Sequence, residues 1–434
     1  MSDDGDPRYF GALAPELIDN VLFEIDSVRA LSNSIIASRY ARRRFEGRKH
    51  PVLWRVLQNE LGPVLTDAKF LRLFPYADPG GSPQKWMAYR DGIHNMAAVH
   101  KGMLGSDGCG RAGGDVAVPS FAELTQLCRT LHKMNFLAST YVTAQLRSFS
   151  GEELATAPPS RAERLRVLRA FYRRQIVCNT WAPTRRELYW TNQDTAAISN
   201  TSEHQGERLG LFAAFEPWEL QQVDHADWFV TRLCAALCLA GEEVAQPIGE
   251  AKFGDIFSHA DHLVQYMREH PSITDTVLRT SLSPRRLRSQ EVPDATPACS
   301  QYIERYSLLC PQFAWQIQRL ESFPDPARDQ HGEQQQQQED DSGLSVNFVG
   351  DAVDLPPFGW VDALDGRYVN CFGDALVDFI SRTVVPDDKE MYFACHVSLE
   401  AWRSAGFALW DQRRVKAIKE LDRLRTLRTG WLVY

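Results

Sequence analysis

Few residues in this chain have the types and spacing that a metal site requires. His259 and His262 lie three positions apart, with Asp255 and Asp261 nearby. Zinc needs three or four ligands at fixed distances, and two histidines at this spacing supply two at most. No paired-cysteine motif completes the set. The sequence therefore predicts neither a metal site nor another cofactor.

Residues that could take part in catalysis do not form a complete set either. The range 108–113 matches the spacing of a dinucleotide-binding loop, but no strand leads into it and Pro119 delays any following helix. Asp224, His225 and Asp227 could hold a perturbed histidine, yet no nucleophile is identifiable beside them. The serine-nucleophile sequence Gly-x-Ser-x-Gly does not occur. We expect that the protein is not an enzyme; a catalytic pocket that forms only in the folded chain is an alternative.

A run of arginines begins just after Ser160 at helical spacing. We interpret it as the solvent-exposed face of a helix. The alternative is a surface for an acidic partner or for RNA, although no known pattern of exposed aromatic residues accompanies it. The net charge of −8 and the pI of about 5.8 argue against a nucleic-acid partner. The residues are Arg161, Arg164, Arg166, Arg169, Arg173, Arg174, Arg185 and Arg186.

The clearest pattern of elements lies in residues 13–44. Apolar residues recur there every three or four positions, which predicts one stripe on a helix. Pro15 suits the first turn of that helix, and Ser27 is a candidate N-cap for a second short helix. Two such helices cannot bury both stripes against each other, so apolar surface should remain for another element or another protein. The stripes comprise Leu13, Leu17, Ile18, Val21, Leu22 and Ile25, and then Val28, Leu31 and Ile35.

The order and spacing of these residues resemble an F-box, the three-helix module that docks a substrate receptor onto a cullin ubiquitin ligase. The F-box pattern opens Leu-Pro-x-Glu-Leu-Leu and continues to Val-Ser-Arg. Ala14, Ala37 and Ala41 depart from it, at positions where proline, valine and tryptophan are usual. The matching residues are Leu13, Glu16, Leu17, Ile18, Val21, Leu22, Ile25, Leu31, Ser38 and Arg39.

The resemblance implies a non-catalytic substrate receptor that recruits an unidentified protein substrate to the ligase. It implies that an exposed stripe of Leu17, Ile18, Val21 and Leu22 binds the ligase's adaptor subunit. The expected adaptor-binding residues are Leu13, Pro15, Leu17, Ile18, Val21, Leu22, Ile25, Leu31 and Ile35. Two alternatives are an F-box-like scaffold that never joins a ligase and a helical hairpin that packs on the rest of the chain.

Three further segments resemble a group of filamentous-fungal proteins of unassigned function. One is the segment 50–63, a predicted helix with proline near its start and a Gly-Pro stop. The others are the segments 211–220 and 406–414, so the resemblance touches the beginning, middle and end of the chain. It names a group of proteins but no substrate.

The remaining sequence predicts a mainly α fold, in which the N-terminal three-helix F-box-like module precedes an irregular helical body with long loops. Ser160 and Glu163 form a capping box, and Pro217 should open a later helix that closes at Gly241. The glutamine- and acid-rich tract has too few apolar residues to order itself. We divide the chain into a flexible acidic N-terminus (1–9), the module with its following helix (10–63), a loop-rich connection (64–120), a helical body (121–322), a disordered linker (323–345) and a C-terminal segment that packs on the body (346–434).

Composition sets the expected surroundings. The nine cysteines have no regular spacing, which is typical of reduced thiols in the cytoplasm or nucleus. Cys234 and Cys238 lie within an apolar stripe and should pack in the core. The N-terminus is acidic and lacks the apolar core of a signal peptide, and we find no membrane-spanning run.

Overall fold

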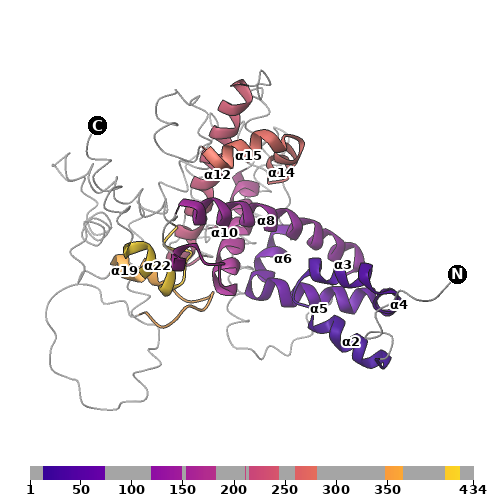
Figure 1. The fold of residues 1–434 in the computed structure, drawn as a ribbon. Helices are drawn as coiled ribbons and strands as arrows, with labels where there is room; N and C mark the ends of the chain where they lie inside the picture. Colours follow the sequence, from indigo (N-terminus) through magenta and orange to yellow (C-terminus); the bar gives the residue numbers. More distant parts are fainter. Residues whose placement is uncertain are drawn as a thin grey trace, which may run out of the picture.

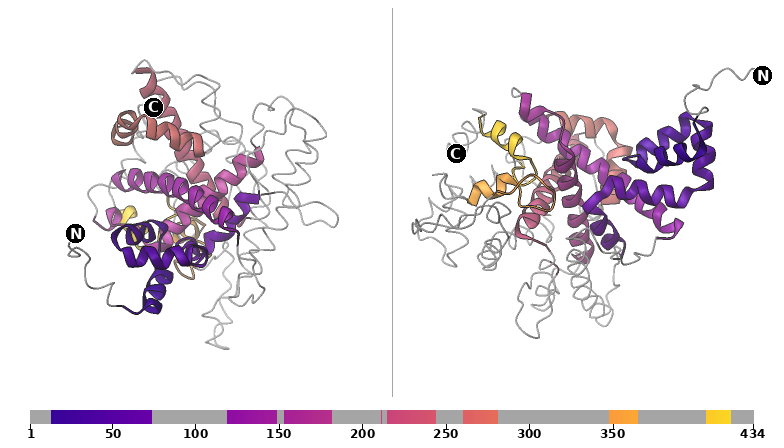
Figure 2. Two further views of the ribbon diagram at one scale, coloured as in Figure 1. Left: turned by 90° about the vertical axis from the view of Figure 1, so that its right-hand side faces the viewer. Right: turned by 90° about the horizontal axis from the view of Figure 1, so that it is seen from below.

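The computed structural model describes residues 13–73, 119–148, 153–181, 211, 215–243, 260–280, 348–364 and 406–420. Within these ranges every regular element is a helix, which confirms the predicted mainly α fold. The N-terminal helices lie at one end of the molecule, and the last two helices lie at the other (Figures 1 and 2). The predicted linker (323–345) and the segment 182–210 fall outside the described residues.

The N-terminal module consists of three short helices followed by a longer one. Pro15 occupies the first turn of the first helix, as predicted. The Ser27 hydroxyl accepts a hydrogen bond from the Ala30 amide at 3.2 Å, and Ser38 caps the third helix in the same way at the Ala41 amide. The helices are α2 (Pro15–Glu24), α3 (Val28–Ala37), α4 (Arg39–Gly47) and α5 (Lys49–Leu61).

The chain continues as helix beyond the module. At the end of α5, Gly62 adopts φ +49°, a conformation that favours glycine, and begins the short 3-10 helix η1 (Gly62–Val64). Helix α6 (Leu65–Leu73) follows directly. The prediction of a loop-rich connection from residue 64 is therefore wrong over its first ten residues, because Ala68, Phe70 and Leu71 pack their side chains into the core. Residues 74–118, with the predicted glycine-rich loop, lie outside the described ranges.

The body is built around one central helix, α10 (Arg161–Trp181), which packs against α6, α8 and α12. Its N-terminus has the predicted capping box, because Ser160 and Glu163 each accept a hydrogen bond from the other's backbone amide. Every residue from Leu165 to Asn179 is buried, so α10 has almost no solvent face. The other body helices are α8 (Phe121–Ser148), α9 (Glu153–Thr156), α12 (Pro217–Glu243), α14 (Ala260–Glu269) and α15 (Pro271–Thr280).

Two details of α12 bear on the sequence analysis. Pro217 opens the helix, as predicted, but the helix continues through Gly241 to Glu243, so the predicted stop at Gly241 is wrong. An isolated glycine costs a helix only about 1 kcal/mol relative to alanine, which the rest of a long helix can offset. Cys234 is buried in the core, as predicted.

The described parts of the C-terminal segment, residues 348–364 and 406–420, pack on the body; the rest of the predicted segment 346–434 lies outside the described residues. The two described parts carry α19 (Phe358–Leu364) and α22 (Gln412–Glu420). Trp410 is fully buried and stacks on Tyr141 of α8, with ring centroids 6.0 Å apart. Gly406 adopts φ +73°, and a Cβ atom there would lie 2.6 Å from the Tyr141 hydroxyl oxygen. Residues 406–410 are thus part of the core.

Candidate partner-binding surface

Helix α2 divides its apolar residues between the core and the solvent. Ile18 and Leu22 are 4% and 0% exposed, because α2 packs against α4 and α5 on that side. Leu17 and Val21 are 50% and 42% exposed, and Leu13 just before the helix is also exposed. The predicted exposed stripe is therefore wrong for Ile18 and Leu22. Leu13, Leu17 and Val21 remain exposed to solvent.

The other predicted adaptor-binding residues are distributed in the same way. Pro15 is exposed at the start of α2, whereas Leu31 is buried in the core. Ile25 and Ile35 are partly buried against that core. Ile36 is 71% exposed and was not predicted, because it falls outside the stripe of Val28, Leu31 and Ile35. The one signal in the sequence is that Ile36 does not share the three- or four-residue spacing that places Val28, Leu31 and Ile35 on one side of the helix.

Polar contacts hold α2 in a fixed position. The buried carboxylate of Asp19 accepts hydrogen bonds from the Arg44 guanidinium and pairs with Arg48 at 3.1 Å. The hydrogen bond from Arg44 holds the pKa of Asp19 below its ordinary value. At the C-terminal end of α2, the Asn59 side-chain amide donates to the carbonyl oxygens of Phe23 and Ile25 at 2.8 and 3.0 Å. The exposed side chains of α2 therefore project from a rigid helix.

Glu60 joins the module to the body. One of its carboxylate oxygens accepts from the Val28 amide at the start of α3, at 2.7 Å. The other accepts from the Asn135 side chain of α8, at 2.8 Å. Burial raises the pKa of Glu60, and these two hydrogen bonds oppose that rise only in part. The N-terminal module is thus joined to the body by a hydrogen bond between α5 and α8.

The central arginines of α10 lie inside the protein. Arg166, Arg169, Arg173 and Arg174 of α10 are all buried, so both predictions for them, a solvated face and an acidic-partner or RNA surface, are wrong. Their charges are matched by carboxylates from other elements. Arg174 pairs with Asp227 of α12 at 2.8 Å. Arg161 and Arg164 are exposed, and Arg185 and Arg186 lie outside the described residues.

Asp67 and Glu219 form the centre of this buried network. The Arg173 side chain lies 2.7 Å from Asp67 of α6 through Nε, and 2.7 Å from Glu219 of α12 through Nη1. Arg169 contacts Glu219 at 3.3 Å and also pairs with Asp354 before α19. Asp67 also lies 3.8 Å from Arg169. Each of the two carboxylates therefore contacts two arginines, and three segments, α6, α12 and the residues before α19, meet α10 at this point. Removing these charges from water costs free energy that their mutual attraction only repays, so the intact network adds little net stability. Removing one of its members destabilises the fold strongly, because the remaining charge stays buried and unpaired.

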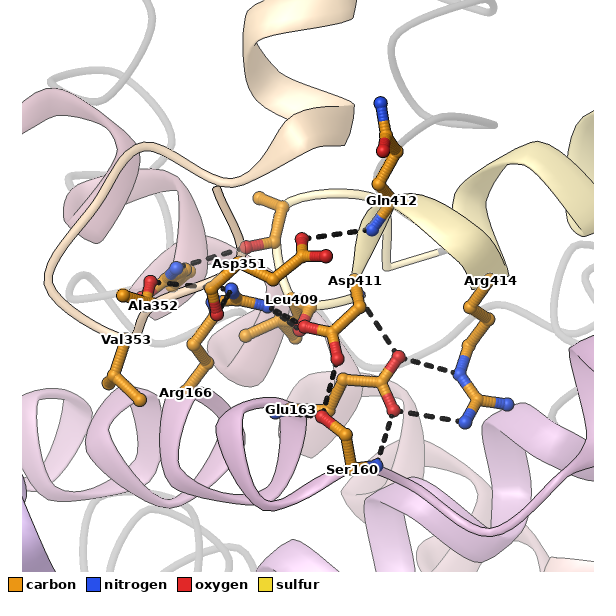
Figure 3. Close-up of polar contacts among 12 residues, drawn as sticks. Ser160, Glu163, Arg166, Asp351, Ala352, Val353, Leu409, Asp411, Gln412 and Arg414 are labelled. Atoms are coloured by element: carbon orange, nitrogen blue, oxygen red, sulfur yellow. Dashed lines mark hydrogen bonds and ion pairs between the residues drawn. The ribbon is translucent and has the colours of Figure 1, made fainter. Parts of the chain in front are cut away.

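A second group of contacts ties the C-terminal segment to the start of α10, as Figure 3 shows. Arg166 donates to Asp411 at 2.7 Å and to the Asp351 carbonyl oxygen at 2.5 Å. Arg414 makes a two-point contact with Glu163, at 2.8 and 2.9 Å. Glu163 is the capping-box residue, so the cap of α10 also anchors α22. These contacts join the C-terminal segment to the start of α10.

The groups singled out for catalysis or metal binding are engaged elsewhere. His225 is buried, and its Nδ1 lies 2.7 Å from the Gln221 carbonyl oxygen, while Asp227 pairs with Arg174. Asp261 pairs with Lys133 at 2.5 Å. No group of three or more histidine, cysteine or acidic residues in the described ranges could hold a metal ion. His259, Asp255 and the range 108–113 lie outside those ranges.

Comparison of the chain with protein-family models, with curated proteins and with solved structures found no match. None of the helices that the structure describes has both the length and the apolar character needed to cross a membrane. The F-box resemblance therefore rests on the sequence pattern alone.

Proposed function

We propose that the protein is an F-box-like substrate receptor that docks on the adaptor subunit of a cullin-type ubiquitin ligase through α2. The observation that carries the proposal is the exposure of Leu17 and Val21 on one side of α2, with Leu13 exposed just before the helix, while the other side of α2 packs in the core. Adjacent exposed apolar side chains on a rigid element are the kind from which interface hot spots are built.

The rigidity of α2 supports this role. Asp19 holds the middle of the helix and Asn59 holds its C-terminal end, so an incoming partner need not order it first. Preorganisation of this kind reduces the entropy lost on binding. In this proposal the protein forms no covalent intermediate: the ligase transfers ubiquitin, and the helical body presents an unidentified protein substrate.

Co-purification tests the proposal. A tagged wild-type chain should bring down the adaptor and cullin subunits, and the double variant Leu17→Asp/Val21→Asp should lose both. Arg129→Glu on α8 is the matched control, because Arg129 is also exposed but belongs to the body. Loss of the adaptor from the control as well, or its retention by the double variant, would contradict docking through α2.

A second candidate is an F-box-like scaffold that joins no ligase. It is favoured by Ala41, which is fully buried where the F-box pattern commonly carries tryptophan. A small residue there lets α4 pack closely on its neighbours. In that case a folded wild-type chain would co-purify with other proteins, and neither adaptor nor cullin would be among them.

A further inference from the structure

We infer that Asp19 is a positioning residue for docking: its pairing with α4 sets the rotation of α2 that presents Leu17 and Val21 to the adaptor. The inference rests on the proposed function and deepens it. Asp19 is the one charged side chain that α2 buries, with 4% of the residue exposed. A carboxylate is costly to bury unless cations compensate it, so the partners of Asp19 decide where this side of α2 can lie.

Helical geometry relates Asp19 to the exposed residues. Successive residues of an α-helix lie about 100° apart around its axis, so residues two positions apart lie about 160° apart. Leu17 and Val21 each stand two positions from Asp19. Their side chains therefore flank the point directly opposite Asp19 across the helix axis. A contact that fixes the direction of Asp19 also fixes the direction of both exposed side chains.

The contacts of Asp19 are directional. Arg44 donates from Nε to Oδ1 at 2.9 Å, and its Nη2 donates to Oδ2. Nη1 of Arg48 lies 3.1 Å from the same Oδ2. A two-point contact between a guanidinium and a carboxylate holds the two planar groups in one relative orientation. The hydrogen bond from Arg44 also holds the pKa of Asp19 below its ordinary value, which keeps the side chain ionised at neutral pH.

The other contacts of α2 restrict its rotation less. Ile18 and Leu22 are buried, but apolar contacts are not directional. Asn59 holds only the C-terminal end of the helix. At the N-terminal end, Ala14 provides no side-chain cap, and a helix of ten residues is too short to be stable by itself. The orientation of the N-terminal half of α2 therefore depends on Asp19.

Hydrogen–deuterium exchange of the free, full-length chain tests this dependence without a partner. Asp19→Asn preserves the size of the side chain but removes its charge, and it should speed amide exchange in α2 by about tenfold. Glu24→Gln is the matched control, because it removes a carboxylate from an exposed position of the same helix. Its exchange should equal that of wild type. If Asp19→Asn does not fold, Arg44→Met serves for the same measurement, because the Arg44 side chain is 35% exposed.

Adaptor binding then tests the link between Asp19 and docking. If Asp19→Asn leaves α2 in the binding orientation in about one chain in ten, the dissociation constant rises about tenfold. Arg44→Met should cause a similar loss, and the double variant should lose no more than either single variant, because both changes remove the same contact. All titrations are made well below the melting temperature of each variant. A loss of stability alone then leaves the dissociation constant unchanged.

The outcomes separate this inference from the proposed function. Exchange in α2 that is the same in Asp19→Asn as in wild type would overturn the inference, whether or not the adaptor binds. Wild-type affinity of Asp19→Asn for the adaptor, or additive losses in the double variant, would overturn it as well. Failure of the wild-type chain to bind the adaptor contradicts the proposed function, and the exchange measurement still decides whether Asp19 orients α2.

Discussion

Leu17 and Leu22 lie on one helix, yet half of the first side chain is exposed and the second is fully buried. At the scale of single residues this difference assigns them different roles. Leu22 stabilises the fold by leaving water, whereas Leu17 gains little from folding and could gain from a partner. Ile18 and Val21 repeat the same division.

Truncation to alanine should separate the two roles. Leu22→Ala removes a fully buried side chain and should lower the free energy of unfolding by about 2–5 kcal/mol. Leu17→Ala should change it by less than about 1 kcal/mol, because the side chain is half exposed in the folded state. Urea denaturation of the two variants measures both values. Equal destabilisation would show that Leu17 is buried by part of the protein itself.

At the scale of elements, the arginines of α10 determine how the helices assemble. Arg173 lies between Asp67 of α6 and Glu219 of α12, so α10 must pack with both at once. A misplaced α12 would leave buried charges unpaired, which is far more costly than a lost apolar contact. The network therefore favours one arrangement of these helices over others.

Replacing Arg173 with methionine should show this cost. Asp67 and Glu219 would stay buried with only Arg169 to compensate them, so Arg173→Met should lower the free energy of unfolding by about 3–5 kcal/mol. Lys133→Met is the matched control, because Lys133 and its partner Asp261 are 31% and 44% exposed. The control should cost less than about 1 kcal/mol. Comparable losses in a chemical denaturation experiment would mean that the α10 network contributes no more than a surface pair.

Glu60 gives the contact between the module and α8 a dependence on pH. Burial raises its pKa in the folded protein above the ordinary value of 4.5. A carboxyl group whose pKa is raised by folding favours the folded state when it is protonated. Its contribution to the free energy of unfolding is therefore largest below pH 4.5 and is lost as the pH rises through the pKa of the folded protein. Glu60→Gln has no such ionisation. The stability of wild type relative to Glu60→Gln should therefore decline as pH rises from 4.5, and thermal melts across that range measure it. A wild-type advantage that grows with pH would contradict this account.

At the scale of the whole molecule, the sequence predicts local structure better than it predicts long-range partners. Ser27, Ser160 and Glu163 were predicted as caps because a cap depends on residues three positions away. The burial of Arg166 and Arg173 could not be predicted in this way, because Asp411 and Asp67 lie 245 and 106 positions from them. One local signal was available. The apolar residues of α10 are spread around the whole helix and are not confined to one side. This pattern is typical of a helix that is buried on all sides.

The candidate surface was predictable only in part for a related reason. Periodicity places Leu17, Ile18, Val21 and Leu22 on neighbouring sides of one helix, but it does not say which side meets α5. The packing of α2 on α4 and α5 decides that Ile18 and Leu22 belong to the core.

The central claim is that α2 presents a binding surface that is not needed for folding. The most direct test is the dissociation constant between the purified chain and a purified cullin-ligase adaptor, measured by calorimetry beside the melting temperature. Leu17→Asp/Val21→Asp should weaken binding on the order of a hundredfold or more while it costs only about 1 kcal/mol of stability. An unchanged dissociation constant, absence of binding by the folded wild type, or unfolding of the double variant would contradict the account.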